Sequence, residues 1–295
     1  MRWLRLLRLP FVSVTVVACA LGLAAAVRAG APMDAGLAVT VVGLAALVHL
    51  GANVVNDYFD ARNGSDAINT ERVAPFTGGS RVLQDGDFAP ESVRAIGAGL
   101  LAVGAIGGLW LATRVGVALV PVGVAGVALA WAYSAPPLAL MSRGLGELGI
   151  ALAWGLVVIG AAITLHPASL ATTYWVAPGY AATVAAILFI NTFPDRHADS
   201  IAGKRTLVVR LGPGSARAVY PLILLLAYLP PIVGVAWGEL PVSVLYCLGG
   251  LPLSLVGAHS LWRHSGAPAR LRGAIVATIL ASLAYGTGAA LGLAS

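Results

Sequence analysis

Long apolar runs alternate with short polar segments along the whole chain. About twenty consecutive apolar residues cross the hydrocarbon layer of a bilayer as one helix. Runs of that kind occupy roughly residues 10–28, 36–59, 92–113, 115–133, 145–165, 170–193, 217–237, 241–262 and 271–292. The pattern therefore predicts an all-α, polytopic membrane protein with about nine transmembrane helices, which we expect to form a single domain over residues 1–295.

The composition agrees with this prediction. The chain is 59% hydrophobic and only 10% charged, whereas soluble domains carry about 25% charged residues. Arg2, Arg5 and Arg8 followed by an apolar run resemble a signal peptide, but the runs that follow favour a retained first helix with a cytoplasmic N-terminus. Cys19 and Cys247 both lie in apolar runs, which favours two small buried residues over a disulfide.

The charges are distributed unevenly between the two sides that this topology predicts. Of 18 Lys and Arg residues, only Arg28 and Arg114 fall on the outer side. This is a strong positive-inside bias, and it explains the net charge of +6 without a nucleic-acid partner. Of 12 acidic residues, only Asp34 and Glu239 fall outside. Orientation rules do not require inward acids, so we expect chemistry at the cytoplasmic face, in the cytoplasmic membrane of a prokaryote.

One polar cluster closes the second apolar run. Asn53, Asn56, Asp57 and Asp60 follow i, i+3, i+4, i+7 spacing, so on a helix they share one face. Carboxylates at membrane depth cost roughly 3 kcal/mol each on insertion scales. Such groups are tolerated where they face a polar cavity or an ion.

A second cluster ends the sixth run, about 138 residues later. Asn191, Asp195 and Asp199 follow i, i+4, i+8 spacing, and Pro194 lies among them. Proline removes a backbone donor and disfavours helix at the preceding residue, which predicts a break or kink there. Two acidic clusters at matching helix ends indicate one shared metal site; the alternative is two pairs of hydrated carboxylates in loops.

The ligand class follows from donor type and charge. Oxygen ligands from Asp and Asn suit Mg²⁺, or Mn²⁺, bound together with substrate phosphate. The proposed metal ligands are Asn56, Asp60, Asp66, Asp195 and Asp199. Two Mg²⁺ would cancel the charges of the four aspartates, and a diphosphate would then need the cations of the adjoining loops. These are Arg72, Arg81, Arg143, Arg196, Lys204 and Arg205.

A third stretch connects the fourth and fifth runs. Arg143 and Glu147 are one helical turn apart, which is equally compatible with a local ion pair at a helix start. Tyr133 would face the cavity or anchor the helix at the interface. Lys204 is the only lysine in the chain; its place beside the acidic loop reflects either chance or a need for an ammonium group.

Taken together, five motifs resemble the UbiA superfamily of intramembrane prenyltransferases over the whole chain. The motifs are Asn56-Asp-Tyr-Phe-Asp60, Tyr133-Ser-Ala-Pro-Pro137, Arg143-Gly-Leu-Gly-Glu147, Asp195-Arg-His-Ala-Asp199 and Gly203-Lys-Arg-Thr-Leu207. Thr77-Gly-Gly-Ser-Arg81 is similar to the 1,4-dihydroxy-2-naphthoate branch, which serves menaquinone synthesis.

The resemblance implies helices around a central cavity that two acidic loops cap on the cytoplasmic side. It implies a first motif of Asn-x-x-x-Asp-x-x-x-Asp, in which Asn56 and Asp60 match while the third position falls on Gly64, with Asp66 as the nearest acid. Asp195 and Asp199 match the second motif.

The activity implied is Mg²⁺-dependent transfer of a polyprenyl group from its diphosphate to an aromatic acceptor, through an allylic cation. The candidate substrate-binding residues are Asn53, Asp57, Arg72, Arg81, Tyr133, Arg143, Asn191, Lys204 and Arg205. Aromatic rings that would stabilise the cation are Phe59, Phe76, Trp131, Tyr133 and Phe189. The alternatives are another acceptor (4-hydroxybenzoate, homogentisate, a tetrapyrrole, a carotenoid or a lipid) or, from another class, an ion-coupled transporter.

Overall fold

The computed structural model describes residues 2–295, and within them every regular element is helical. The segments before the first long connection are α1 (Arg2–Leu7), η1 (Leu9–Phe11), α2 (Val12–Arg28), α3 (Ala35–Asn63) and α4 (Ser65–Ile68). The middle of the chain forms α5 (Pro90–Val115), α6 (Leu119–Ala132), η2 (Leu140–Arg143), α7 (Gly146–Leu165), η3 (Pro167–Ser169) and α8 (Leu170–Ile201). The remainder forms α9 (Leu207–Leu211), α10 (Pro213–Ala216), α11 (Val219–Ala236), η4 (Val242–Gly250), α12 (Leu251–His264), η5 (Pro268–Arg270) and α13 (Arg272–Ala294).

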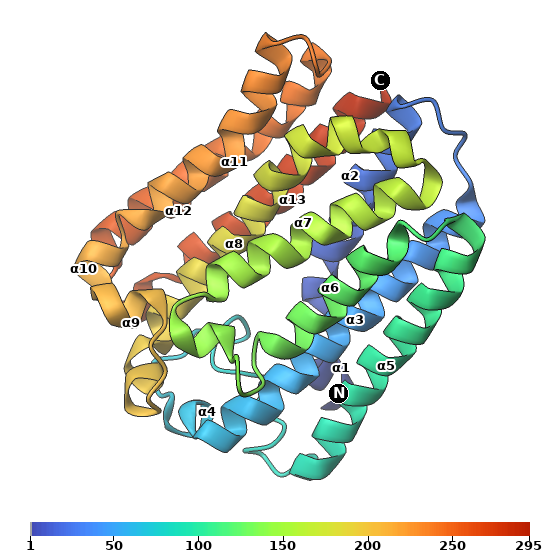
Figure 1. The fold of residues 1–295 in the computed structure, drawn as a ribbon. Coiled ribbons are helices and arrows are strands. Elements are labelled where there is room, and N and C mark those ends of the chain that lie inside the picture. The colour runs from blue at the N-terminus through green and yellow to red at the C-terminus, as the bar shows by residue number, and fades with distance from the viewer. Residues whose placement is uncertain (1) are drawn as a thin grey trace.

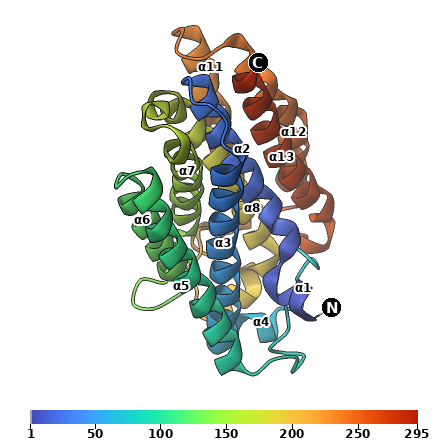
Figure 2. The same cartoon turned by 90° about the vertical axis from the view of Figure 1, so that its right-hand side faces the viewer.

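The prediction of an all-α membrane protein is confirmed. Eight helical segments of the described chain are long and apolar enough to cross a membrane, and the shorter apolar helix α6 corresponds to the fourth predicted run. Its 14 residues extend only about 21 Å at 1.5 Å per residue. The chain is an integral membrane protein, whose two ends lie at opposite ends of the bundle (Figures 1 and 2).

Helix α8 is the central element. Most of its apolar span is buried, and it packs against α7 on one side and α11 and α13 on the other. Tyrosine hydroxyls satisfy their hydrogen bonds within this core: Tyr180 donates to the carbonyl of Val14 at 2.6 Å, and Tyr285 to that of Ala227 at 3.0 Å. Buried hydroxyls need such partners, so these bonds fix how α8 faces α2 and how α13 faces α11.

The two acidic helices extend further than the apolar pattern predicts. Helix α3 continues to Asn63, where Gly64 ends it in a left-handed conformation (φ 84°), which glycine adopts without steric cost. Helix α8 continues to Ile201 with Pro178 and Pro194 inside it. Of the break or kink predicted at Pro194, the break is therefore wrong, because the residues around Pro194 remain helical, as proline within membrane helices allows when packing supports the turn. The acidic clusters thus lie on helical turns and not in loops.

Candidate active site

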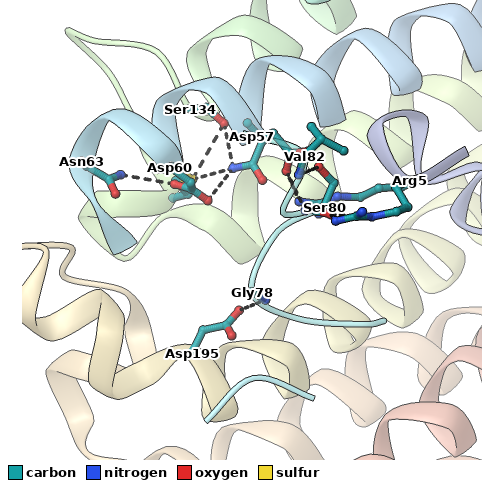
Figure 3. A network of polar contacts seen from close by, with 12 residues as sticks. Arg5, Asp57, Asp60, Asn63, Gly78, Ser80, Val82, Ser134 and Asp195 are labelled. Carbon is teal, nitrogen blue, oxygen red and sulfur yellow. Dashed lines mark hydrogen bonds and ion pairs between the residues drawn. The ribbon is translucent and has the colours of Figure 1, made fainter. Parts of the chain in front are cut away.

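The end of α3 presents Asn56 and Asp60 as an interacting pair. The Asn56 amide donates to an oxygen of Asp60 at 3.2 Å and contacts the Ser134 hydroxyl, also at 3.2 Å. Asn63 donates to the other Asp60 oxygen at 3.2 Å. Figure 3 shows this group around Asp60 on α3. The Asp60 side chain is thereby oriented by amide groups one turn away on each side.

Asp57 turns away from this pair. It forms an ion pair with Arg8, and the backbone N–H of Ser80 donates to the same Asp57 oxygen at 3.3 Å. Figure 3 shows Asp57 and Ser80 together, apart from Asp60. The sequence pattern places Asp57 and Asp60 on one face of α3, but their side chains have different roles. Asp60 lines a pocket, whereas Asp57 anchors η1 and the loop that follows α4.

Asp195 on α8 is held by that same loop. The Asn69 amide donates to one carboxylate oxygen at 2.6 Å, and the backbone N–H of Gly78 donates to the other at 3.3 Å. The loop segment carrying Gly78 runs between α3 and α8 in Figure 3. Burial raises the pKa of the neighbouring Asp66 carboxyl to about 7, with nearby Asp60 and Asp57 adding to the effect.

Gly79 is required where the loop crosses Asp66. It has a φ of +71°, and a Cβ there would overlap the Asp66 carboxylate. Any L side chain would therefore both strain the backbone and displace Asp66. This explains the second glycine of the Thr77-Gly-Gly-Ser-Arg81 motif in physical terms.

Lys204 joins the two acidic helices. Its ammonium lies 2.5 Å from an Asp60 oxygen and 3.3 Å from an Asp199 oxygen, and its side chain is buried. Burial alone would lower the pKa of Lys204, but Asp60 and Asp199 outweigh this and raise it, so the group carries a charge. Residues that are 139 positions apart in the chain (60 and 199) thus meet at one cation.

A polar pocket of about 130 Å³ lies between the acidic ends, lined among others by Asn56, Asp60, Asp66, Asp195 and Lys204. Beneath it is an apolar cavity of about 610 Å³ between α2, α3, α5, α6 and α7, closed on one side by α8. Six residues line both spaces: Arg8, Asn56, Phe76, Tyr133, Leu188 and Asn191. The two spaces are therefore neighbours that share a wall of these side chains.

Most of the sequence-predicted site residues meet here. Asn56, Asp60, Asp66, Tyr133, Asn191, Asp195, Asp199 and Lys204 line the polar pocket, and Asn53 lines the apolar cavity. Among the aromatic residues considered, Phe76 and Tyr133 line both spaces, whereas Phe59, Trp131 and Phe189 line neither.

The polar pocket is lined by none of the five predicted loop arginines, which are Arg72, Arg81, Arg143, Arg196 and Arg205. Arg81 donates to the Asp66 carbonyl, and Arg143 is exposed and donates to the Pro137 carbonyl at 2.6 Å. The backbone N–H of Arg205 donates to the Ser142 carbonyl at 2.9 Å, while the exposed Arg72 packs its aliphatic part over Gly78. The local pair between Arg143 and Glu147 is not formed, since Arg143 points to Pro137 and Glu147 lines the pocket.

Sequence reasoning gave no binding role to several residues of the pocket, among them Arg8, Asn69, Glu147 and Thr206. The sequence analysis counted Arg8 only among the inward charges, yet it lies four positions before the start of α2 and contacts Asp57 from a backbone with a φ of 48°. For Glu147, the sequence left a local ion pair with Arg143 as an equal alternative. Arg8 could have been identified as a candidate from the sequence, because it is a charged residue directly before a predicted membrane span.

The donors of the pocket suit a divalent cation, although within residues 2–295 no three His, Cys, Asp or Glu side chains are already gathered around one point. Five carboxylates line the pocket (residues 60, 66, 147, 195 and 199) against the two cations Arg8 and Lys204. The side-chain oxygens of Asn69 and Asn191 are buried without a hydrogen-bond partner. Hard oxygen donors in excess of positive charge are what Mg²⁺ binds, so the residues fit this ion.

Comparison with known proteins agrees with this geometry. The profile of the UbiA prenyltransferase family matches residues 15–283. A 1,4-dihydroxy-2-naphthoate octaprenyltransferase from Mycobacterium tuberculosis is 32% identical over 75% of this chain and 73% of its own. A 2-carboxy-1,4-naphthoquinone phytyltransferase from Synechocystis is 28% identical over 90% of this chain and 82% of its own.

Solved structures share the fold. An apo UbiA homolog from Aeropyrum pernix K1 superimposes with a TM-score of 0.67 at 17% identity, covering 93% of this chain and 96% of that one. A UbiA homolog from Archaeoglobus fulgidus bound to DMAPP and Mg²⁺ gives 0.64 at 16% identity, covering 99% of each chain. With the fold, the family profile and the named relatives in agreement, the chain belongs to the UbiA prenyltransferase family and is a prenyltransferase of the membrane.

Proposed function

We propose that this prenyltransferase transfers a polyprenyl group from polyprenyl diphosphate to 1,4-dihydroxy-2-naphthoate, with Mg²⁺ as cofactor, in menaquinone synthesis. The observation that carries the site assignment is the ammonium of Lys204 between Asp60 and Asp199, in a polar pocket that adjoins a large apolar cavity. The naphthoate acceptor is supported by the names of the relatives and by the Thr77–Arg81 motif.

The donor fits the two spaces by its own chemistry. Its diphosphate is anionic and matches the pocket with Lys204 and Arg8, while its isoprenoid tail is a hydrocarbon and matches the cavity. Burying the tail there removes apolar surface from water. Because Asn56, Tyr133 and Asn191 line both spaces, the bond between prenyl C1 and the diphosphate would lie near these side chains.

Mg²⁺ would be held by Asp60, Asp66, Asp195 and Asp199 with the amide oxygen of Asn56, and it would supply electrostatic stabilisation of the departing diphosphate. Lys204 would bind phosphate oxygens as a compact charge and Arg8 as a planar donor. Asn69 and the Gly78 N–H hold Asp195 in position, so the site is organised before substrate arrives.

In the reaction, the C1–oxygen bond breaks and its electron pair leaves with diphosphate. The electron-rich ring of the acceptor then attacks C1, and loss of CO₂ restores the aromatic ring. Phe76 and Tyr133 line the boundary between the spaces, where their π faces would stabilise the allylic cation. The apolar walls below them exclude water, which would otherwise capture the cation.

We further propose that the active site faces the cytoplasm of a prokaryotic cell. The positive-inside distribution supports this orientation, because Arg28 and Arg114 are the only cations of the sequence that it assigns to the opposite face.

The deciding experiment offers the purified protein one prenyl diphosphate and one acceptor at a time, with and without Mg²⁺, and identifies products by mass. We expect prenylated, decarboxylated naphthalenediol and diphosphate from 1,4-dihydroxy-2-naphthoate only when Mg²⁺ is present. Product from 4-hydroxybenzoate or homogentisate alone would reject the acceptor. Absence of diphosphate release with every acceptor would reject the reaction.

A further inference from the structure

The connection between α4 and α5 consists of turns and bends, and one turn of it, at residues 78–81, lies against two of the proposed metal ligands. The N–H of Gly78 donates to Asp195 of α8, and Gly79 lies against the Asp66 carboxylate. Figure 3 shows the first of these contacts. The position of the 78–81 turn therefore determines how carboxylates from two different helices are arranged.

The backbone of the 78–81 turn is unfavourable on its own. The angle φ is +75° at Gly78, +71° at Gly79 and +67° at Arg81. Glycine adopts such angles without steric cost, but an arginine in this conformation is uncommon and persists only where the surrounding structure holds it. The contacts that reach the turn from other elements are therefore needed to maintain its shape.

Arg5 of α1 supplies one of these contacts. Its Nε and one of its Nη atoms both donate to the carbonyl oxygen of Ser80, at 3.3 Å and 3.0 Å. The N–H of Ser80 donates to Asp57, which is paired with Arg8. Figure 3 shows Arg5 and Asp57 beside Ser80. Both peptide groups of Ser80 are thus held by arginines that precede α2, by Arg5 directly and by Arg8 through Asp57.

Two carboxylates of the same connection orient the Arg5 guanidinium. Asp85 and Asp87 both form ion pairs with it, the second at 3.2 Å. The side chains of Arg5, Asp85 and Asp87 are 42%, 46% and 32% exposed. Ion pairs this exposed contribute little to the stability of a whole protein, so we expect the effect of Arg5 to be local to the 78–81 turn.

Helix α1 gives Arg5 a fixed base. A helix of six residues is not stable by itself in water, but α1 is held by its apolar side chains. Leu6 is fully buried in one cluster with Val82 of the connection. Trp3 packs edge to face on Phe88, with ring centroids 4.8 Å apart. The helix and the connection are therefore packed together on both sides of Arg5.

We propose that Arg5 is a positioning residue for the metal site. By fixing the Ser80 carbonyl, Arg5 keeps the 78–81 turn in contact with Asp66 and Asp195, and carboxylates that are held in place bind an ion more tightly. The inference rests on the proposed function, which assigns both carboxylates to Mg²⁺. Arg5 lines neither the polar pocket nor the apolar cavity, so its loss weakens metal binding and leaves the reacting groups in the protein.

The first measurement follows hydrogen exchange of the backbone amides of residues 76–82 in the purified, metal-free protein, by the mass of the peptides that cover them. We expect Arg5→Met to speed exchange of this segment about tenfold, because the Ser80 carbonyl loses both of its donors. Arg2→Met is the matched control. Arg2 lies on the same helix and contacts the ring of Phe88, so this variant removes an equal charge and should leave the exchange unchanged.

The second measurement is the Mg²⁺ dependence of turnover with a prenyl diphosphate and 1,4-dihydroxy-2-naphthoate. Arg5→Met should raise the Mg²⁺ concentration for half-maximal rate about tenfold, the lower end of the effect of a group that orients a metal ligand. The KM of the acceptor and the rate at saturating Mg²⁺ should change less than about twofold. Arg5→Lys keeps the charge but not the planar donors, and its half-saturating Mg²⁺ concentration should lie between those of wild type and Arg5→Met.

Three results would overturn the positioning role. The first is normal hydrogen exchange of residues 76–82 in Arg5→Met, and the second is an equal change in Arg2→Met. The third is a lower maximal rate of Arg5→Met with an unchanged half-saturating Mg²⁺ concentration, which is the result that a purely structural role of α1 predicts. If wild type turns over no prenyl diphosphate with Mg²⁺, the proposed function fails instead, and the exchange rates still decide whether Arg5 holds the 78–81 turn.

Discussion

The glycines of α6 and those between α13 and η4 serve opposite purposes. Between α13 and η4 they let backbones touch: a Cβ at Gly288 would overlap the Tyr246 carbonyl, and one at Gly292 would overlap that of Ser243. In α6, by contrast, a Cβ at Gly123 would meet nothing within 4 Å, and this residue lines the apolar cavity. None of the residues that line the two cavities belongs to α11, η4, α12 or α13.

This difference teaches that glycine content alone does not identify close packing in a membrane protein. Helices associate in lipid through small residues that permit close contact, and the C-terminal helices follow that rule. Gly97 of α5 follows it too, since a Cβ there would overlap Val55 of α3, whereas Gly123 and Gly126 of α6 leave space in the wall of the apolar cavity. The C-terminal helices therefore support α8, while α6 helps to enclose the cavity.

The largest expected effect is a loss of catalytic activity in a variant that still folds. Asp60→Asn should lower kcat/KM by about a thousandfold, at the upper end of what one electrostatic group contributes, because it removes the charge shared with Lys204. Product formation measured by mass checks the rate, and the thermal midpoint checks the fold. Asp34→Asn, at the opposite end of α3, preserves the N-cap to Leu37 and should be active. Equal activity of the two variants would contradict the site.

A pair of glycine substitutions sharpens the comparison of packing. Gly288→Ala forces a methyl group into the Tyr246 backbone, and overpacking of this kind costs about 1–3 kcal/mol. We expect its thermal midpoint in detergent to fall by several degrees. Gly123→Ala should keep the midpoint or raise it slightly, because alanine favours helix by up to about 1 kcal/mol. Similar shifts in the thermal midpoints of both variants would show that α6 and the α13–η4 contact are packed alike.

The smallest effect concerns pH. The Asp66 pKa is raised from its ordinary value to about 7 by burial and by neighbouring carboxylates. The folded protein therefore binds a proton more tightly than the unfolded chain, and stability falls as pH rises from about 4 through about 7. Without metal, the thermal midpoint should fall by a few degrees between about pH 5 and pH 8. Asp66→Asn should flatten this slope, whereas Gly288→Ala should lower the midpoint equally at both pH values.

The fold was largely predictable because membrane helices are specified locally. The nine apolar runs correspond to nine helical segments, of which α6 is too short to span by length alone. What the pattern could not give was where a helix ends once polar residues begin. Helices α3 and α8 end at Asn63 and Ile201, after their acidic residues. They continue that far because partners from loops and neighbouring helices form hydrogen bonds or ion pairs with the acidic side chains.

The acidic residues of the site were predictable from the sequence, whereas most of the basic residues that line it were not. Helical spacing brings Asn56 and Asp60 to one side, and the two acidic helices do meet through Lys204. Spacing cannot reveal that Asp57, one residue from Asn56, faces Arg8. The spacing also does not distinguish a loop arginine that donates to a carbonyl group, such as Arg143, from Arg8, which lies before α2 and lines the pocket.

Lys204 has a consequence for how the enzyme is loaded. Its ammonium forms ion pairs with both Asp60 and Asp199, so under the proposed function a divalent ion that used these oxygens would have to displace it. The displaced, buried ammonium would need a new anionic partner, and the pyrophosphate of the donor would be one. By reciprocal linkage, each of the two ligands would then strengthen the binding of the other, and the resting protein would discriminate against metal that arrives without prenyl donor.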